Sequence, residues 1–267
     1  MTLPVERQLR THERPGGTVA DRRLSETPVA ASWPLVPRCA VISGRRWLRD
    51  VSAAGWFRDR LHPFGSDVGS LVPEGFEAYA RVFHPVVVPG ASPRRWSEVA
   101  AANGRHAHPQ MQLHTISRPD DAASPEFYER GPGFDAGSLP AVERHVLVEL
   151  LRPATSSPQR CWFGVWEGFG GLDDQGVRER VVVPNRAYLL ASGPVERALD
   201  PFHDPDQSAN LWWPDDHAWF VATEIDLAWT YVGASAAVVA DLVADPRVEA
   251  MEAQIGDRFS YDSDNLN

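Results

Sequence analysis

Residues 211–231 read LWWPDDHAWFVATEIDLAWTY, and this stretch decides the fold class. Its aromatic and β-branched residues fall into three short runs, which predict strands over Asn210–Trp213, Ala218–Ile225 and Ala228–Val232. Pro214–His217 supplies turn residues for a hairpin between the first two strands. Because a short hairpin link joins its strands antiparallel, the stretch predicts one antiparallel or mixed sheet.

The flanking sequence adds strands and helices to these three strands. Further strands are expected at Phe76–Val88, His106–Ser117, Cys161–Trp166, Arg180–Val183 and Ala187–Ser192. Helices, marked by apolar residues at helical spacing and by capping residues, are expected at Gly44–Leu61, Ser92–Ala101, Pro140–Leu151 and Ala236–Ala244. Most strands fall in hairpins and do not alternate with helices. The sequence therefore predicts an α+β fold, an antiparallel or mixed sheet with helices packed on one side.

The chain divides into three parts by composition. Residues 1–36 are rich in arginine, proline and threonine, show no periodicity, and are expected to be a disordered extension. Residues 37–256 are expected to form a single α+β domain, and residues 257–267 a polar, frayed tail. No apolar run approaches 18 residues and no secretory signal precedes the domain, so we expect a cytoplasmic protein that does not bind membranes.

The basic and sulfur-containing residues exclude several enzyme classes. All 26 basic residues of the chain are arginine, and this excludes Schiff-base catalysis, pyridoxal phosphate attachment and the lysine of a P-loop. The two cysteines, Cys39 and Cys161, lie too far apart for a CxxC motif, which excludes dithiol redox chemistry and a cysteine-based zinc site. The sequence leaves the cofactor unknown.

The net charge of −10 is unevenly distributed. Residues 200–267 contain 14 acidic residues against Arg247 and Arg258, a balance of −12, whereas residues 1–199 carry +2. An acidic region repels the phosphate backbone, so we expect no nucleic-acid binding there. The same region would attract a basic protein or a cationic ligand, or would serve only to keep the protein soluble.

Three histidines are the best candidates for metal ligands. His106, His108 and His114 would share one face of a strand, and imidazole nitrogens converging from one side are typical of zinc and related sites. The distance along a strand from His108 to His114 requires a bend if all three are to bind one ion. The alternative is a polar strand face that contacts water.

The opening stretch offers a second candidate site. Successive strand residues point to opposite faces, so Trp212 and Trp213 cannot both point inward. One interpretation is an aromatic surface rimmed by acids, suited to a cationic or peptide ligand; the other is that helices and residues 118–138 cover the tryptophans on both faces. Glu224 and Asp226, two residues apart, could act as a general acid and base or could mark a solvent-facing edge of the sheet. The candidate binding residues are Trp212, Trp213, Asp215, Asp216, Trp219, Glu224 and Asp226.

Residues 160–250, and above all the segment from Leu211 through Val232-Gly233-Ala234-Ser235, resemble a family of soluble actinobacterial proteins. The resemblance implies no activity. Three hypotheses follow from the residues. The first is a non-enzymatic binding or adaptor protein that recognises a basic protein or a cationic ligand. The second is a metal-dependent enzyme built on His106, His108 and a carboxylate such as Glu224, and the third is a structural or oligomeric subunit. Whether the protein is an enzyme, and its oligomeric state, stay open.

Overall fold

The computed structural model describes residues 47–65, 67–87, 92–117, 136–203 and 206–267. Contacts along the chain separate two compact units, Met1–Ser43 and Gly44–Asn267, and all described residues belong to the second. The predicted extension of residues 1–36 and the thiol of Cys39 lie outside the described residues. No described helix is both long enough and apolar enough to cross a membrane.

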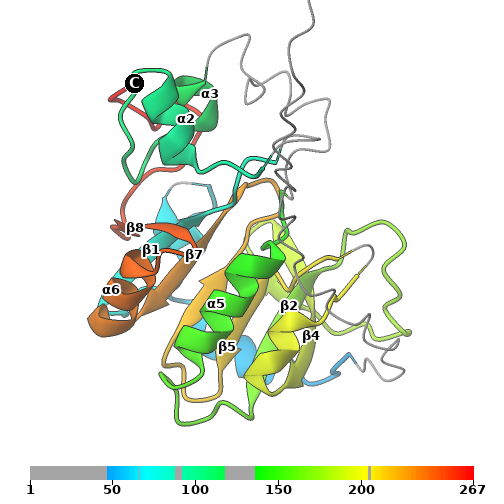
Figure 1. Ribbon diagram of the computed structural model, residues 1–267. Helices are drawn as coiled ribbons and strands as arrows, with labels where there is room; N and C mark the ends of the chain where they lie inside the picture. The colour runs from blue at the N-terminus through cyan, green and yellow to red at the C-terminus, as the bar shows by residue number, and fades with distance from the viewer. Residues whose placement is uncertain (1–46, 66, 88–91, 118–135, 204–205) are drawn as a thin grey trace, which may run out of the picture. The chain divides into compact units, whose positions relative to one another are not determined.

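One antiparallel sheet forms the centre of the second unit (Figure 1). Across the described residues its strand order is β3-β4-β2-β5-β6-β7-β1-β8, and every pair of neighbours runs antiparallel. The predicted α+β fold with an antiparallel sheet is confirmed. The strands are β1 (Ala78–Phe83), β2 (Cys161–Trp166), β3 (Val181–Val183), β4 (Arg186–Gly193), β5 (Leu211–Pro214), β6 (Phe220–Ala222), β7 (Trp229–Ala234) and β8 (Glu249–Ala253).

Helices and short helical turns cover the sheet. The two longest helices, α5 (Ala141–Leu151) and α6 (Ala236–Ala244), lie on the same face (Figure 1), where they share one apolar cluster with the sheet. A second cluster on the opposite face joins the sheet to residues of shorter elements. The shorter helices are α1 (Gly55–Arg58), α2 (Trp96–Ala102) and α3 (Leu113–Ile116), and the 3-10 turns are η1 (Ser52–Ala54), η2 (Val68–Ser70) and η3 (Val195–Leu199).

The tryptophans of β5 show how strand alternation builds these two clusters. Trp212 packs in the cluster of α5 and α6, with its ring centroid 5.3 Å from that of Trp219. Trp213 belongs to the opposite cluster, 5.0 Å from Phe57 and 5.7 Å from Phe220. The prediction that Trp212 and Trp213 point to opposite faces is confirmed, and both faces of the sheet are covered.

The predicted strand His106–Ser117 is wrong. Residues 105–112 form turns and irregular structure, and α3 follows them. The reason is that side chains satisfy the backbone here: Arg81 Nη1 donates to the carbonyl oxygens of Pro109 (2.7 Å) and Met111 (3.0 Å). Pro109 also lacks the N–H that a central strand needs. The regular alternation of polar and apolar residues therefore marks a segment packed against the sheet, outside its ladder.

The predicted helix Gly44–Leu61 is also wrong over its described part. Only η1 and α1 are helical, a total of seven residues. Leu48 N donates to the carbonyl of Leu190 in β4 (2.8 Å), so the start of the segment follows the sheet and cannot complete a helical turn. The apolar spacing correctly places Phe57 in the core, but the observed helix is much shorter than the predicted one.

Candidate functional site

The tryptophans of the predicted binding surface are core residues. Trp212, Trp213 and Trp219 are at most 1% exposed, so they do not form the exposed aromatic surface that we considered. Trp219 Nε1 donates to the carbonyl of Leu151 (3.0 Å), which ties the β5–β6 hairpin to the end of α5. Burial of rings this large contributes to stability and leaves no aromatic face for a partner.

Two of the predicted acids fasten the hairpin to the loop before β2. Asp215 forms an ion pair with Arg160. Asp216 accepts hydrogen bonds from Thr155 Oγ1 (2.7 Å), Ser156 N (2.6 Å) and Ser156 Oγ (2.7 Å). Partial burial alone would raise the pKa of Asp216, but the hydrogen bonds from Thr155 and Ser156 outweigh it and hold this pKa below its ordinary value. Both carboxylates are therefore bonded to neighbouring residues of the protein.

The other two predicted acids, Glu224 and Asp226, do not share a strand. Both follow β6, and Arg186 of β4 reaches across to them: Nε lies 2.7 Å from Glu224 Oε1, and Nη2 lies 3.1 Å from Asp226 Oδ2. Glu224 is buried, and it borders a cavity of about 20 Å³ with Tyr188. That space holds roughly one water molecule, so Glu224 lacks room for a substrate at this cavity.

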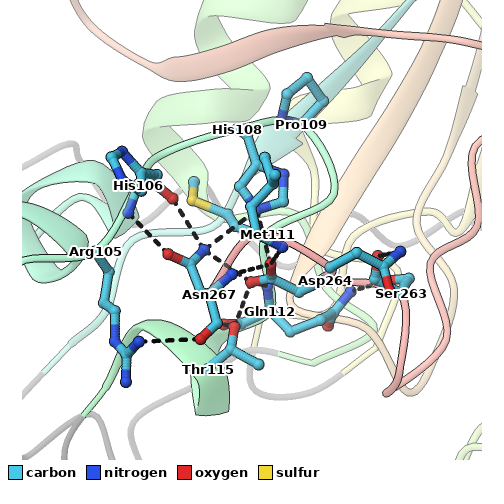
Figure 2. Close-up of polar contacts among 12 residues, drawn as sticks. Arg105, His106, His108, Pro109, Met111, Gln112, Thr115, Ser263, Asp264 and Asn267 are labelled. Atoms are coloured by element: carbon cyan, nitrogen blue, oxygen red, sulfur yellow. Dashed lines mark hydrogen bonds and ion pairs between the residues drawn. The ribbon is translucent and has the colours of Figure 1, made fainter.

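Neighbouring residues hold two of the three candidate histidines through the side chain and one through the backbone; Figure 2 shows His106 and His108. His108 Nε2 lies 2.9 Å from Asp264 Oδ1, and the backbone N–H of His106 donates to Asn267 Oδ1 (2.8 Å). His114, which belongs to α3, stacks on Tyr261 with ring centroids 3.6 Å apart. Within the described residues no group of three histidine, cysteine, aspartate or glutamate side chains is arranged to hold a metal ion. The structure does not bring the three imidazoles together on one strand face.

Asp264 organises this region, as Figure 2 shows. Its carboxylate accepts hydrogen bonds from Gln112 N (3.2 Å), Asn267 Nδ2 (3.0 Å) and the hydroxyl of Thr115. Burial alone would raise the pKa of Asp264, and these hydrogen bonds outweigh it, so the pKa lies well below its usual range. Residues 257–267, expected to fray, are therefore held against residues 105–115 by a buried charge.

A groove of about 240 Å³ opens beside the link between β5 and β6, where β1 begins and β7 ends. Three rings and three charged side chains contribute to its walls, together with short stretches of backbone. We call it the Trp56 groove. The rings belong to Trp56, Phe76 and His217, and the charged side chains to Arg60, Glu74 and Glu77.

The rings of the Trp56 groove are held by contact with one another. Trp56 stacks on His217 with centroids 4.2 Å apart and an interplanar angle of 13°, and Phe76 meets Trp56 edge-on at 6.4 Å. His217 has φ +58°, a left-handed conformation that costs a non-glycine residue roughly 1 kcal/mol. Partial burial lowers the pKa of His217 below its ordinary value.

Each carboxylate of the groove has one oxygen fixed by the protein. Glu77 Oε2 accepts from the backbone N–H of Ala236 at the start of α6 (3.0 Å). Glu74 Oε1 lies 2.5 Å from His62 Nε2, and the other ring nitrogen of His62 lies 2.8 Å from Asp67. These hydrogen bonds, first that of Glu74 and then that of Asp67, raise the pKa of His62. No described residue donates to Glu77 Oε1 or Glu74 Oε2.

The sequence did not point to the Trp56 groove. Its lining comes from four separated stretches, near residues 56–60, 74–77, 217–218 and 234–235. Trp56 lies within the range predicted as a helix, and His217 within the predicted hairpin turn. The nearest sequence signal is Glu74-Gly75-Phe76-Glu77, two acids around a glycine and an aromatic residue. Gly75 has φ +111°, which only glycine adopts readily, so this short stretch forms a turn that a residue with Cβ would strain.

Comparisons with known proteins add no parallel for this site. No protein-family model matches the chain, and no significant match exists to a curated protein or to a solved structure.

Proposed function

We propose that this protein is a non-enzymatic binding protein that captures a positively charged group in the Trp56 groove. The group is the amine of a small cationic ligand or of a basic protein. The observation that carries the proposal is the pair Glu74 and Glu77, whose carboxylates line one groove with one oxygen each fixed and the other without a donor among the described residues. Charge-assisted hydrogen bonds from an ammonium group would complete both carboxylates.

The size of the groove limits what it can hold. Its volume of about 240 Å³ lies below the roughly 300–1,000 Å³ of sites for drug-sized ligands and cofactors. A nucleotide or a flavin therefore exceeds it, whereas a single amine-bearing group fits. A basic protein would insert one side chain or its terminal amine and contact the surrounding surface with the rest.

Electrostatics in the groove favour a cation. Two carboxylates, those of Glu74 and Glu77, face the groove together with the single guanidinium of Arg60, so acids outnumber arginines in its walls. Both acids are preorganised, since His62 and Ala236 hold them before any ligand arrives, and preorganisation reduces the entropic cost of binding. The side chains of Arg60, Glu74, Glu77 and His217 are exposed to solvent. We therefore expect a modest affinity for a ligand that offers only one charge.

Isothermal titration calorimetry with matched probes tests this proposal. L-leucinamide carries an ammonium group at neutral pH, and N-acetyl-L-leucinamide is its uncharged counterpart. We expect leucinamide to bind the full chain and the acetylated probe to bind at least tenfold more weakly. Glu74→Gln and Glu77→Gln should each weaken leucinamide about tenfold, whereas the control Glu252→Gln, an exposed acid of β8, should not.

Two results would overturn the proposal. The first is equal binding, or equal lack of binding, of the two probes to the unchanged protein. The second is leucinamide affinity that stays the same in the Glu74→Gln and Glu77→Gln variants. Unchanged melting temperatures of the variants establish that any loss of affinity comes from the groove and not from unfolding.

A further inference from the structure

Arg60 is a charged residue of the Trp56 groove that recognition of a cation does not explain. Its guanidinium carbon lies 5.7 Å from the centre of the Trp56 ring, and its Nη1 lies close to the backbone of Gly75. The backbone also places it, because the N–H of Glu74 donates to the carbonyl of Arg60 (3.1 Å). Arg60 is thus positioned by the same turn that carries Glu74.

Arg60 forms no ion pair with the acids beside it. Glu74 is directed to His62 and Glu77 to the first turn of α6, and no ion pair of Arg60 exists within the described ranges. A groove that served only cations would hold a repelling positive charge in its wall. A guanidinium without an acidic partner is instead suited to a carboxylate, which it can bind with two parallel hydrogen bonds.

The two kinds of charge lie in one small space. At about 240 Å³ the groove holds one small molecule, so a single ligand would contact both the acids and Arg60. A phosphate ester would meet Arg60 favourably, but its two negative charges would face Glu74 and Glu77. A molecule with one ammonium and one carboxylate group matches all three side chains.

We infer that the ligand of the Trp56 groove is a small zwitterion of the free amino acid class. Its carboxylate pairs with Arg60, and its ammonium group lies against Glu74 and Glu77. The apolar remainder of the ligand packs beside Phe76 and the edge of Trp56. This inference rests on the proposed function, to which it adds the recognition of a carboxylate.

A four-probe titration separates the inference from the proposed function. The probes are L-leucine with both charges, L-leucinamide with the ammonium group only, N-acetyl-L-leucine with the carboxylate only, and N-acetyl-L-leucinamide with neither. We expect leucine to bind at least tenfold more tightly than leucinamide, and both to bind more tightly than the uncharged probe. N-acetyl-leucine should bind weakly, because Glu74 and Glu77 repel it.

The variant Arg60→Gln identifies the residue responsible. It should reduce the affinity for leucine about tenfold, to that of leucinamide, and leave leucinamide unchanged or slightly tighter. Arg58→Gln is the matched control, since Arg58 is an exposed arginine two residues away that does not line the groove. Melting temperatures report whether each variant is folded.

The outcomes are distinguishable. If leucinamide binds as tightly as leucine, and Arg60→Gln changes neither, the inference is wrong and the proposed function stands. If leucine loses affinity equally in the Arg58→Gln and Arg60→Gln variants, the effect is one of general charge and the inference is again wrong. If neither leucine nor leucinamide binds better than the uncharged probe, both the inference and the proposed function are wrong.

Discussion

Two pairs of carboxylates lie close to the ends of β5, β6 and β7 and differ in how their oxygens are used. In Asp216 and Glu224 both oxygens accept hydrogen bonds from the protein. In Glu74 and Glu77 one oxygen is fixed, and the other has no donor among the residues that the structure describes. The first pair therefore holds the fold together, and the second pair is available to a ligand. The number of satisfied oxygens separates the two pairs, whereas local density of acids in the sequence does not.

The largest expected effect tests the structural pair. Glu224→Ala removes the buried partner of Arg186, whose side chain is only 16% exposed. Removing Glu224 leaves the largely buried guanidinium of Arg186 with only an exposed acidic partner, Asp226, so we expect a loss of about 3 kcal/mol in the free energy of unfolding, measured by urea denaturation. The control Asp226→Ala removes the exposed partner of Arg186 and should cost less than about 1 kcal/mol.

A double variant sharpens this result. Arg186→Met combined with Glu224→Leu removes both charges and fills their volume, so it should recover most of the stability that Glu224→Ala loses. Equal losses in Glu224→Ala and Asp226→Ala would contradict the assignment of Glu224 as the structural acid.

The second prediction extends the comparison to the buried acid of residues 257–267. Asp264→Asn should lower the free energy of unfolding at pH 7 by about 2 kcal/mol, because hydrogen bonds to a charged acceptor are lost or weakened. Asp262→Asn, at an exposed neighbour, is the matched control and should change stability little.

The pH dependence of this variant has a definite sign. The pKa of Asp264 lies well below its ordinary value in the folded protein, so the carboxylate contributes its full stabilisation above the unfolded-state pKa of roughly 4. That contribution is lost as the pH falls from about 4 toward the folded-state pKa. Urea denaturation at pH 7, 5 and 3 should therefore show a gap between the unchanged protein and Asp264→Asn that narrows only at pH 3. A gap that stays constant to pH 3 would contradict the prediction.

The third prediction concerns the hairpin acids. In Asp216→Asn the side-chain amide replaces one accepting oxygen with a donor that faces the donors of Thr155 or Ser156. Because Asp216 is exposed to solvent, we expect a loss of about 1 kcal/mol, less than a buried hydrogen-bonded acid would cost. Asp215→Asn affects only an exposed ion pair and should cost less than about 0.5 kcal/mol. Thermal denaturation measures both, and a larger loss in Asp215→Asn would reverse the assignment.

The sequence predicted well those elements whose signals are local. The helix Ala236–Ala244 and the strand Cys161–Trp166 match the structure residue for residue. Ser235 caps this helix by accepting a hydrogen bond from Val238 N, and alternating apolar residues mark the strands. The opposite orientations of Trp212 and Trp213 also followed from alternation alone.

Elements that depend on distant partners were missed. The strand β8 has the sequence EAMEA, which favours a helix, and pairing with β1 makes it extended. Its first residue, Glu249, accepts from the backbone N–H groups of Trp96 and Ser97 (2.6 and 2.8 Å), about 150 residues away. Tertiary contacts of this kind override local preference and leave no periodic trace in the sequence.

The candidate site was missed for the same reason. Its acids, its arginine and its histidine come from stretches as far apart as residues 60 and 217, which only the folded sheet brings together. The acids and tryptophans near residue 215 are the densest such group in the sequence, and the structure does not place them in the groove. These tryptophans are buried and these acids are bonded within the protein, so they stabilise the β5–β6 hairpin. The Trp56 groove forms at the edge of that hairpin.

The smallest expected effect on stability concerns the groove acids and completes the comparison. Glu77→Gln keeps an oxygen that can accept from Ala236 N, so the free energy of unfolding should change by less than about 0.5 kcal/mol. The same substitution should weaken leucinamide about tenfold, because the amide carries no charge to meet an ammonium group. Asp216→Asn is the mirror control: it should lower stability and leave the affinity unchanged, since Asp216 does not line the groove. Urea denaturation and calorimetry on the same two variants give this crossed pattern, and a stability loss in Glu77→Gln as large as that in Asp216→Asn would place Glu77 with the structural acids.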